Sequence, residues 1–263
     1  MKTLLMGVLN CTPDSFSDGG RYDDYQSAIA HGLQMIDQGA DLIDIGGEST
    51  RPGAQRPSAA EEIARVIPVI ESLSSHSVIS VDTMRAEVAS KAIEAGAQII
   101  NDVSGGLADP QMLDLIAQSD VDYICQHWRG FGHEMIHRTG YDNVVDEMIS
   151  ELNQRVEAAI NAGIEEERII IDPGLGFAKE AFHDWEILRQ LDRLHTFNMR
   201  ILIGASRKRF IGALLCRENP CERDAGTAAI TAWCQLHGIW AVRTHEICAN
   251  RDTLDVTAHL MSA

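Results

Sequence analysis

Positive charge is scarce in this sequence, and its scarcity limits the partners that the chain can have. Lysine and arginine together number 22 against 39 aspartate and glutamate residues, which gives a formal net charge of −17. A nucleic-acid partner is not expected, because binding to a phosphate backbone requires a basic face. The acidity would also repel an anionic substrate, so the few cations would have to act locally. Cations do stand at the ends of the strands predicted below, namely Arg51, Arg207, Lys208, Arg209 and Arg243.

Closely spaced cysteine pairs and long apolar segments are also missing. The six cysteines include no Cys-x-x-Cys pair, which disfavours a zinc site or a disulfide framework and indicates the reduced thiols of a cytoplasmic protein. No apolar run approaches the length of a membrane span. The apolar stretch at the amino terminus is too short for a signal peptide, and polar residues follow it at once. We therefore expect a cytoplasmic chain without membrane contact.

Linker-like composition is the third absence. No stretch rich in proline, glycine and serine divides the 263 residues, so residues 1–263 are predicted to form one domain. Within it, short apolar runs that end in a polar residue recur, and a stretch long enough for a helix separates successive runs. The predicted strands are residues 4–10, 42–48, 78–82, 98–102, 123–127, 169–172, 201–208 and 240–245. This alternation predicts an α/β fold, a (β/α)8 (TIM) barrel whose site lies at the carboxyl ends of the strands.

The sixth run shows this pattern most clearly. Three isoleucines at 169–171 predict a strand buried on both faces, and Asp172 follows them directly before Pro173 and Gly174. Asp82 and Asn101 stand at the ends of two other runs. A single such residue could be a helix cap. Several at one face of a barrel indicate a binding site, because clustered carboxylates repel one another unless a ligand or cation accepts them.

Two cofactor motifs are present only in weak form. His133-Glu134-x-x-His137 satisfies a zinc pattern, but glycines on both sides leave little chain for a supported helix, so a loop is expected. A zinc hydrolase is the rival hypothesis that this motif leaves open. Gly174-x-Gly176 lacks the third glycine of the dinucleotide fingerprint.

The seventh run ends in the cations Arg207, Lys208 and Arg209, just before a helix that is predicted to begin near Phe210. Basic side chains and the free backbone amides of a helix start together favour an anion site. The alternative is a solvated basic run. Late strands of such barrels often bind phosphate, which favours the anion site.

Longer motifs run nearly from end to end of the chain. They are residues 7–10 with 12–20, residues 44–53, Ser-Val-Asp-Thr at 80–83, Ile-Asn-Asp at 100–102, Asp-Pro-Gly-x-Gly-Phe at 172–177, Ser-Arg-Lys at 206–208 and Arg-x-His at 243–245. In this order they resemble the motifs of the dihydropteroate synthase family. The resemblance implies the same barrel fold. It also implies an enzyme of folate biosynthesis that condenses (7,8-dihydropterin-6-yl)methyl diphosphate with 4-aminobenzoate, giving 7,8-dihydropteroate and diphosphate.

The resemblance further implies roles for single residues. The Asp172 carboxylate and the Asn101 amide would bind the N–H-bearing edge of the pterin, with Asp82 toward the far ring. Lys208 would donate to the pterin, and the Arg243 guanidinium would cover the face of the ring. The implied catalytic residues are Asp82, Lys208, Arg243 and His245, and the implied substrate-binding residues are Thr50, Arg51, Asp82, Asn101, Asp172, Phe177, Gly204, Ser206, Lys208, Arg243 and His245.

For the leaving group, the resemblance implies that Asn10 holds Mg2+ on the diphosphate, while His245 and Arg51 contact phosphate oxygens. Thr50 and Ser206 would lie near the aminobenzoate. We expect the diphosphate to leave before the amine attacks, and residues 11–20 and 51–57 to close over the site and exclude water. The resemblance implies a homodimer as well, and a family that is the target of sulfonamides; the susceptibility of this chain does not follow from its sequence.

Two residues depart from the family pattern. Gln126 stands where the family commonly has a methionine beside the pterin, and Cys11 replaces a more usual apolar residue. Two further rivals remain. A pterin-dependent methyltransferase barrel would not require the Thr50-Arg51 loop or the motif at 206–208, and a non-catalytic pterin-binding paralogue would have lost loop or phosphate residues.

Overall fold

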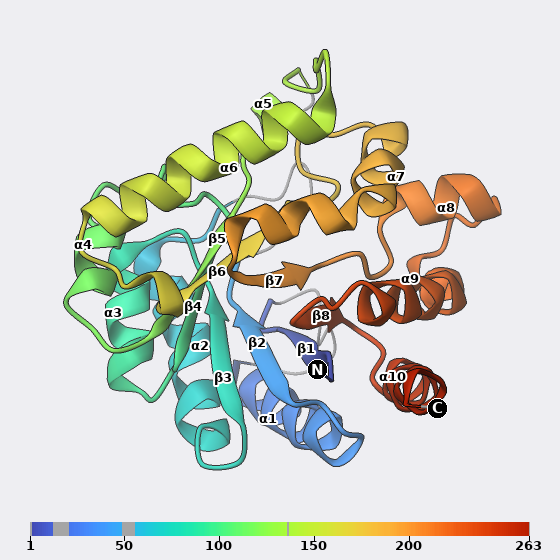
Figure 1. The fold of residues 1–263 in the computed structure, drawn as a ribbon. Helices are drawn as coiled ribbons and strands as arrows, with labels where there is room; N and C mark the ends of the chain where they lie inside the picture. The colour runs from blue at the N-terminus through green and yellow to red at the C-terminus, as the bar shows by residue number, and fades with distance from the viewer. Residues whose placement is uncertain (1, 13–20, 49–55, 136, 263) are drawn as a thin grey trace.

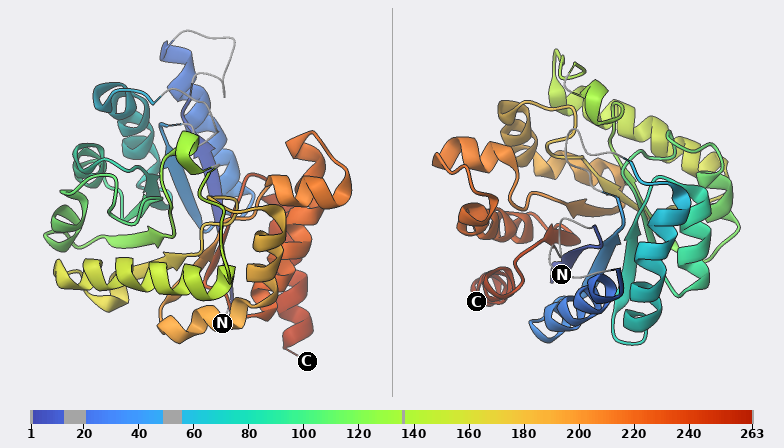
Figure 2. Two further views of the ribbon diagram at one scale, coloured as in Figure 1. Left: turned by 90° about the horizontal axis from the view of Figure 1, so that it is seen from above. Right: turned by 180° about the vertical axis from the view of Figure 1, so that it is seen from behind.

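The computed structural model describes residues 2–12, 21–48, 56–135 and 137–262. Eight parallel strands form a closed barrel in chain order, in which β8 pairs with β1. Figure 1 shows the helices arranged around these strands, and the views from above and from behind show the same ring of helices (Figure 2). The predicted (β/α)8 barrel is therefore confirmed.

The elements alternate as the sequence predicts. The strands are β1 (Leu4–Asn10), β2 (Leu42–Gly46), β3 (Val78–Asp82), β4 (Ile99–Asp102), β5 (Asp122–Gln126), β6 (Ile169–Asp172), β7 (Arg200–Ile203) and β8 (Ala241–Thr244). The helices are α1 (Arg21–Asp37), α2 (Ala59–Leu73), α3 (Ala86–Glu94), α4 (Met112–Ala117), α5 (Gly132–Met135), α6 (Val144–Asn161), α7 (Ala181–Arg189), α8 (Arg209–Leu215), α9 (Asp224–Leu236) and α10 (Cys248–Met261). Short 3-10 turns η2 (Glu166–Arg168), η3 (Leu191–Phe197) and η4 (Pro220–Arg223) complete the connections.

Two apolar layers hold the barrel together. Because successive side chains of a strand point to opposite faces, every second residue points into the barrel and the others point toward the helices. The interior layer consists of Met6, Leu42, Ile99, Ile124, Ile170, Leu202 and Ala241. Their neighbours, such as Leu5, Ile43, Ile100 and Ile171, pack in the larger layer beneath the helices. The strand residues two places beyond the interior layer therefore point inward again, near the carboxyl end of the barrel.

Side-chain caps fix the starts of two helices. Ser58 precedes α2 and forms a capping box with Glu61, whose side chain accepts the Ser58 N–H at 2.8 Å. Asn143 precedes α6 and accepts hydrogen bonds from the backbone N–H groups of Val145 and Asp146.

Two local predictions were wrong in detail. The seventh strand was predicted to reach Lys208 but ends at Ile203, so residues 204–208 form a turn before α8. The segment around Glu134 was predicted to be a loop but contains the four-residue helix α5. Within the described residues, the search for three or more clustered His, Cys, Asp or Glu side chains that could hold a metal found none. The described helices also include none that is long and apolar enough to cross a membrane.

Candidate active site

Polar residues replace apolar ones on the interior face at the carboxyl end of the barrel. Asn101, Gln126 and Asp172 each follow an interior isoleucine by two positions on β4, β5 and β6. Gly204 and Arg243 follow Leu202 and Ala241 in the same way. The structure thus brings together predicted site residues that are up to 142 positions apart in the chain (Asn101 to Arg243, 243 − 101). The reason is that parallel strands end at one face of a barrel.

Asp44 on β2 accepts hydrogen bonds from three residues of this face, although it was not predicted as a site residue. It accepts hydrogen bonds from Ser80 Oγ at 2.6 Å, from Asn101 Nδ2 at 3.1 Å and from Arg243 Nη1 at 3.0 Å. Burial lowers the pKa of Arg243, but the carboxylates of Asp44, Asp172 and Asp82 outweigh it and raise the pKa, so the guanidinium stays charged. Asp44 therefore fixes the orientation of two predicted pterin contacts. The sequence signal that could have identified Asp44 as a site residue was its position in the motif at 44–53, two residues before Gly46.

Several acceptors on this face have no hydrogen-bond partner among the described residues, although Asp172 Oδ2 lies 4.0 Å from Arg243 Nη2. Asn101 Oδ1, Gln126 Oε1 and Asp172 Oδ2 are buried without a hydrogen bond. The other Asp172 oxygen accepts the N–H of Gly174 at 2.7 Å. Buried polar atoms in native proteins are nearly always paired, so unpaired acceptors on three adjacent strands indicate places for donors of a bound molecule.

Asp82 and Asn10 approach each other across Gly46. A side chain at Gly46 would place its Cβ 3.6 Å from Asp82 Cβ and 4.0 Å from Asn10 Oδ1, so a glycine leaves the space between β1 and β3 open. Burial and the neighbouring carboxylate of Asp44 raise the pKa of Asp82 to about 8. Asp82 is therefore an acid that holds its proton more tightly than a solvated aspartate.

The loop after β6 carries Phe177 toward Lys208. Its backbone takes positive φ values at Gly174 (65°), Gly176 (74°) and Ala178 (49°). Lys208 Nζ donates to the Leu175 carbonyl and lies 4.6 Å from the centre of the Phe177 ring. Burial lowers the pKa of Lys208 to about 8. The structure thus brings these two predicted site residues together, and their roles toward a substrate stay predictions.

One cation of the predicted anion site is paired with a carboxylate. Arg207 is held by the Asp224 carboxylate through two hydrogen bonds of 2.7 and 2.8 Å, and Arg209 is exposed on the first turn of α8. Two donors of Arg207 are thus used by Asp224, although its charge still acts on His245. The anion site stays a prediction. The pairing of Arg207 depends on α9, which is distant in sequence from the basic run.

His245 and Ser206 meet at the ends of β7 and β8. Ser206 Oγ accepts the backbone N–H of His245 at 3.1 Å and lies 3.0 Å from its ring Nδ1. Burial and the nearby charge of Arg207 lower the pKa of His245 to about 4, so the ring is neutral near pH 7. A neutral ring can still donate one hydrogen bond to a phosphate oxygen.

Some predicted residues fall outside the described part of the chain. Thr50 and Arg51 lie there, together with residues 13–20 and most of the segment 51–57. The closure of these two segments over the site stays a prediction.

A buried lysine holds the loop after β6 in place. Lys179 Nζ donates to His127 Nδ1 at 2.9 Å and to the carbonyl oxygens of Gly174 and Phe177 at 3.0 and 3.1 Å. Because Nδ1 accepts this bond, the other ring nitrogen of His127 carries the proton and donates to Glu151 Oε2 at 3.0 Å. Lys179 was not predicted as part of the site.

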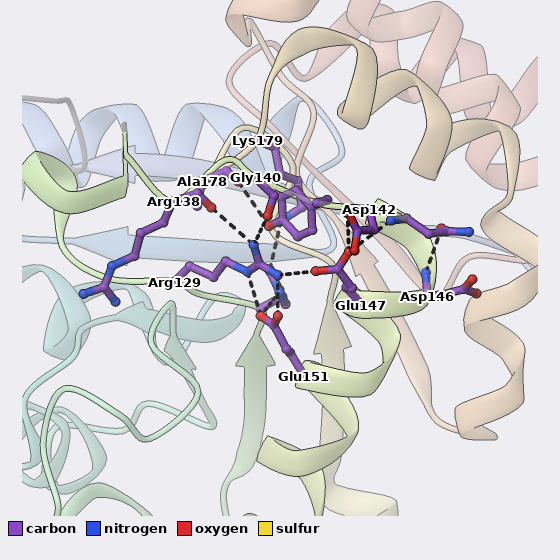
Figure 3. Close-up of polar contacts among 12 residues, drawn as sticks. Arg129, Arg138, Gly140, Asp142, Asp146, Glu147, Glu151, Ala178 and Lys179 are labelled. Carbon is purple, nitrogen blue, oxygen red and sulfur yellow. Dashed lines mark hydrogen bonds and ion pairs between the residues drawn. The ribbon is translucent and has the colours of Figure 1, made fainter.

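Arg129 closes the other half of this arrangement (Figure 3). It donates to Glu151 Oε2 at 2.9 Å and to the Gly140 carbonyl at 2.8 Å, and its guanidinium lies 3.7 Å from the centre of the Tyr141 ring. The Tyr141 hydroxyl in turn donates to the Ala178 carbonyl at 3.1 Å. We call the closed set Lys179, His127, Glu151, Arg129 and Tyr141 the loop anchor. It connects β5 and α6 to the loop that carries Phe177.

Comparison with known proteins agrees with this geometry. The family model described as pterin binding enzyme matches residues 6–245. The dihydropteroate synthase of Mycobacterium leprae is 44% identical over 98% of this chain and 94% of its own length. That of Bacillus subtilis is also 44% identical, over 94% of this chain and 84% of its own length.

Solved structures give the same answer. The Xanthomonas albilineans dihydropteroate synthase with 4-aminobenzoic acid superposes with a TM-score of 0.94 at 42% identity, covering 100% of this chain and 94% of that one. The Yersinia pestis dihydropteroate synthase in a sulfonamide complex gives a TM-score of 0.93 at 36% identity, with 100% and 95% covered. The barrel, its polar interior face and these matches together show that the chain belongs to the pterin-binding enzymes and, among them, to the dihydropteroate synthases.

Proposed function

We propose that the polar interior face binds a pterin and that the chain joins it to 4-aminobenzoate. The substrates would be (7,8-dihydropterin-6-yl)methyl diphosphate and 4-aminobenzoate, and the products 7,8-dihydropteroate and diphosphate. The observation that carries the proposal is the two buried acceptors that lack a hydrogen bond among the described residues, Asn101 Oδ1 and Asp172 Oδ2, beside the charged Arg243. An ionised carboxylate and an amide suit the N–H-bearing edge of a pterin, and a guanidinium can cover its face.

The remaining wall residues fit the second substrate. Phe177 and Lys208 lie together on one side of the face, and Gly204 makes room for Arg243, whose Nη2 lies 3.2 Å from the place of a Cβ at that glycine. Ser206 is buried next to His245. We assign the aminobenzoate neighbourhood to Ser206 and Phe177, and to Thr50 in the segment outside the described residues.

The chemistry of Asn10 fits a magnesium ion. Asn10 ends β1 on the interior face, and the space beside its Oδ1 is kept open by Gly46. An amide oxygen is a hard ligand, and magnesium often takes only one or two protein ligands together with water and substrate phosphates. When bound, such an ion would offset the negative charge of the leaving group. His245 would supply a hydrogen bond to the same group, together with Arg51.

For the reaction, we propose that the bond between the pterin methylene and the diphosphate oxygen breaks first. The electron pair leaves with the diphosphate, and the methylene carbon becomes cationic. Asp82 ends β3 on the interior face, and its carboxyl group, although protonated near pH 7 in the free protein, would ionise beside this cationic carbon and stabilise its charge. The aminobenzoate nitrogen then forms the new bond and loses a proton. No strong general base is needed, because the electrophile is already activated.

Assembly and location are further parts of the proposal. Residues 1–263 would act as one pterin-binding domain in a homodimer. In support, the apolar side chains of Leu236, Val256 and Leu260 on the neighbouring helices α9 and α10 are more than half exposed. We place the protein in the cytoplasm, in keeping with six cysteines that form no disulfide.

One assay tests the reaction. Diphosphate release is measured with both substrates and with each substrate omitted in turn, and a sulfonamide is added as a competitor of 4-aminobenzoate. We expect release only when both substrates are present, and we expect the sulfonamide to slow it. Release that does not depend on 4-aminobenzoate would contradict a synthase and point to a hydrolase.

A further inference from the structure

Gln126 is a buried polar residue that the proposed mechanism does not use. It ends β5, is 0% exposed, and lies directly opposite Asp172 in the register between β5 and β6. It follows the interior residue Ile124 by two positions, so its side chain points to the same face as Asp172. Its Cγ lies 3.4 Å from the place of a Cβ at Gly174, which sets the side chain against the loop after β6.

The amide of Gln126 is only half satisfied by the described residues. Its Nε2 lies 3.5 Å from the Val103 carbonyl, at the long limit of a hydrogen bond, and the orientation of the amide group is assigned from this contact. Oε1 is buried and has no partner. An apolar side chain of the same volume would avoid this cost, so packing alone does not account for a glutamine here.

The unpaired oxygen belongs to a set. Asn101 Oδ1, Gln126 Oε1 and Asp172 Oδ2 stand on β4, β5 and β6, which are neighbours in the barrel. A pterin carries an exocyclic amino group with two N–H bonds, next to a ring N–H. If Asp172 Oδ2 accepts from one part of this edge, a second N–H is left that needs an acceptor beside Asp172.

We infer that Gln126 also binds the pterin, as a third acceptor beside Asn101 and Asp172, and that its Oε1 accepts a hydrogen bond from the exocyclic amino group. This inference rests on the proposed function, because it needs a pterin on the interior face. It assigns to β5 a specificity contact for 2-amino heterocycles. A ligand without that amino group would leave Oε1 unpaired and would gain nothing from the glutamine.

The test compares two ligands and two variants by calorimetry. The ligands are 6-hydroxymethylpterin and its counterpart that lacks the 2-amino group, 6-hydroxymethylpteridin-4-one. Gln126→Met keeps the length of the side chain but cannot accept this hydrogen bond. We expect this substitution to lower the affinity for 6-hydroxymethylpterin by about tenfold, which is the typical contribution of one buried neutral hydrogen bond. The affinity for the second ligand should be unchanged.

A matched control is available in α9. Gln235 is 1% exposed, its Oε1 is also unpaired, and its Nε2 donates to the Leu254 carbonyl at 3.3 Å. Gln235→Met removes the same chemical group from the outer layer, and we expect unchanged affinity for both ligands. Gln126→Leu serves as a second variant if Gln126→Met fails to fold, as judged by a cooperative thermal transition.

The outcomes separate the inference from the proposed function. Binding of 6-hydroxymethylpterin by the wild-type protein, together with equal affinities in the wild type and Gln126→Met, would overturn only the role of Gln126. An equal loss of affinity for both ligands in Gln126→Met would also overturn only the role of Gln126. A wild-type protein that binds no pterin would contradict the proposed function itself.

Discussion

Two polar regions meet at the ends of β5 and β6, and they differ in whether their buried polar atoms have hydrogen-bond partners. Inside the barrel, Asn101, Gln126 and Asp172 each keep a buried acceptor without a partner among the described residues. Outside it, the loop anchor pairs Lys179 with three acceptors and closes on itself through Arg129. Consecutive residues, Gln126 and His127, belong to different regions because neighbouring side chains of a strand point to opposite faces.

The pKa values of the acids in the two regions are shifted in opposite directions. Burial and Asp44 raise the pKa of Asp82 inside the barrel to about 8. Burial also raises the pKa of Glu151 in the loop anchor, but hydrogen bonds from His127 and Arg129 outweigh it and lower the pKa to about 2. The inner region thus holds polar groups at a cost to stability and leaves them for a ligand, whereas the outer region uses similar groups to stabilise a loop.

The loop anchor gives the largest predicted effect. Lys179→Met would leave His127 Nδ1 and two backbone carbonyl oxygens unpaired, and each buried unpaired acceptor costs about 1–3 kcal/mol. We expect the free energy of unfolding, measured by urea titration, to fall by about 3 kcal/mol after partial relaxation. Lys91→Met is the control, because Lys91 forms an exposed pair with Glu94 and its loss should change stability by less than about 0.5 kcal/mol. Equal stability of the two variants would contradict the role of the anchor.

In the region inside the barrel, a substitution should lower ligand affinity and not stability. Asp172→Asn removes a charged acceptor that we assign to the pterin, so the affinity for 6-hydroxymethylpterin should fall by about 2 kcal/mol, or roughly thirtyfold. Its thermal stability should be unchanged or higher. Asp122→Asn at the opposite end of β5, where Asp122 pairs with Arg200, should leave the affinity unchanged. An Asp172→Asn protein with full affinity in calorimetry would refute the assignment.

The pH dependence of stability tests the contrast between the two acids. Because the pKa of Asp82 is raised in the fold, the native state keeps a proton that the unfolded chain has released, between about pH 4 and about pH 8. Stability should therefore fall as the pH rises through this window. Asp82→Asn should remove part of the fall, on the order of 1 kcal/mol between about pH 5 and about pH 7.

Glu151 should behave in the reverse sense. Its pKa is lowered in the fold, so its contribution is present above the ordinary pKa of a glutamate and is lost as the pH falls toward about 2. Glu151→Gln should thus lower stability at neutral pH and have little effect in strong acid. Thermal unfolding of both variants across the pH range measures this. Parallel pH profiles for Asp82→Asn and the wild type would contradict the raised pKa.

The smallest effect concerns a single hydrogen bond of the loop anchor. Tyr141→Phe removes the donor to the Ala178 carbonyl but keeps the ring beneath Arg129. We expect a loss of about 1 kcal/mol in the free energy of unfolding, with the affinity for 6-hydroxymethylpterin within a factor of about two. A large loss of affinity would contradict the separation of the two regions, because it would show that the loop anchor affects binding at the interior face.

The sequence predicted most of the fold and most of the residues at the strand ends. The strands follow from short apolar runs, and the helix starts follow from local caps such as Ser58. Both signals depend on neighbours in the chain. The ends of elements were less exact, since the seventh strand stops at Ile203 where the chain turns.

Side-chain pairing was decided by the tertiary structure. Asp44 orients Arg243 across 199 positions, and Asp224 accepts hydrogen bonds from Arg207 next to the predicted anion site. The roles of Lys179 and Gln126 also follow from the tertiary structure. Lys179 donates to three acceptors, and Gln126 has an oxygen without a hydrogen-bond partner among the described residues. A residue's own sequence neighbours fix which face of the strand it occupies. Whether its polar atoms are then satisfied depends on groups that only the closed barrel brings within hydrogen-bonding distance.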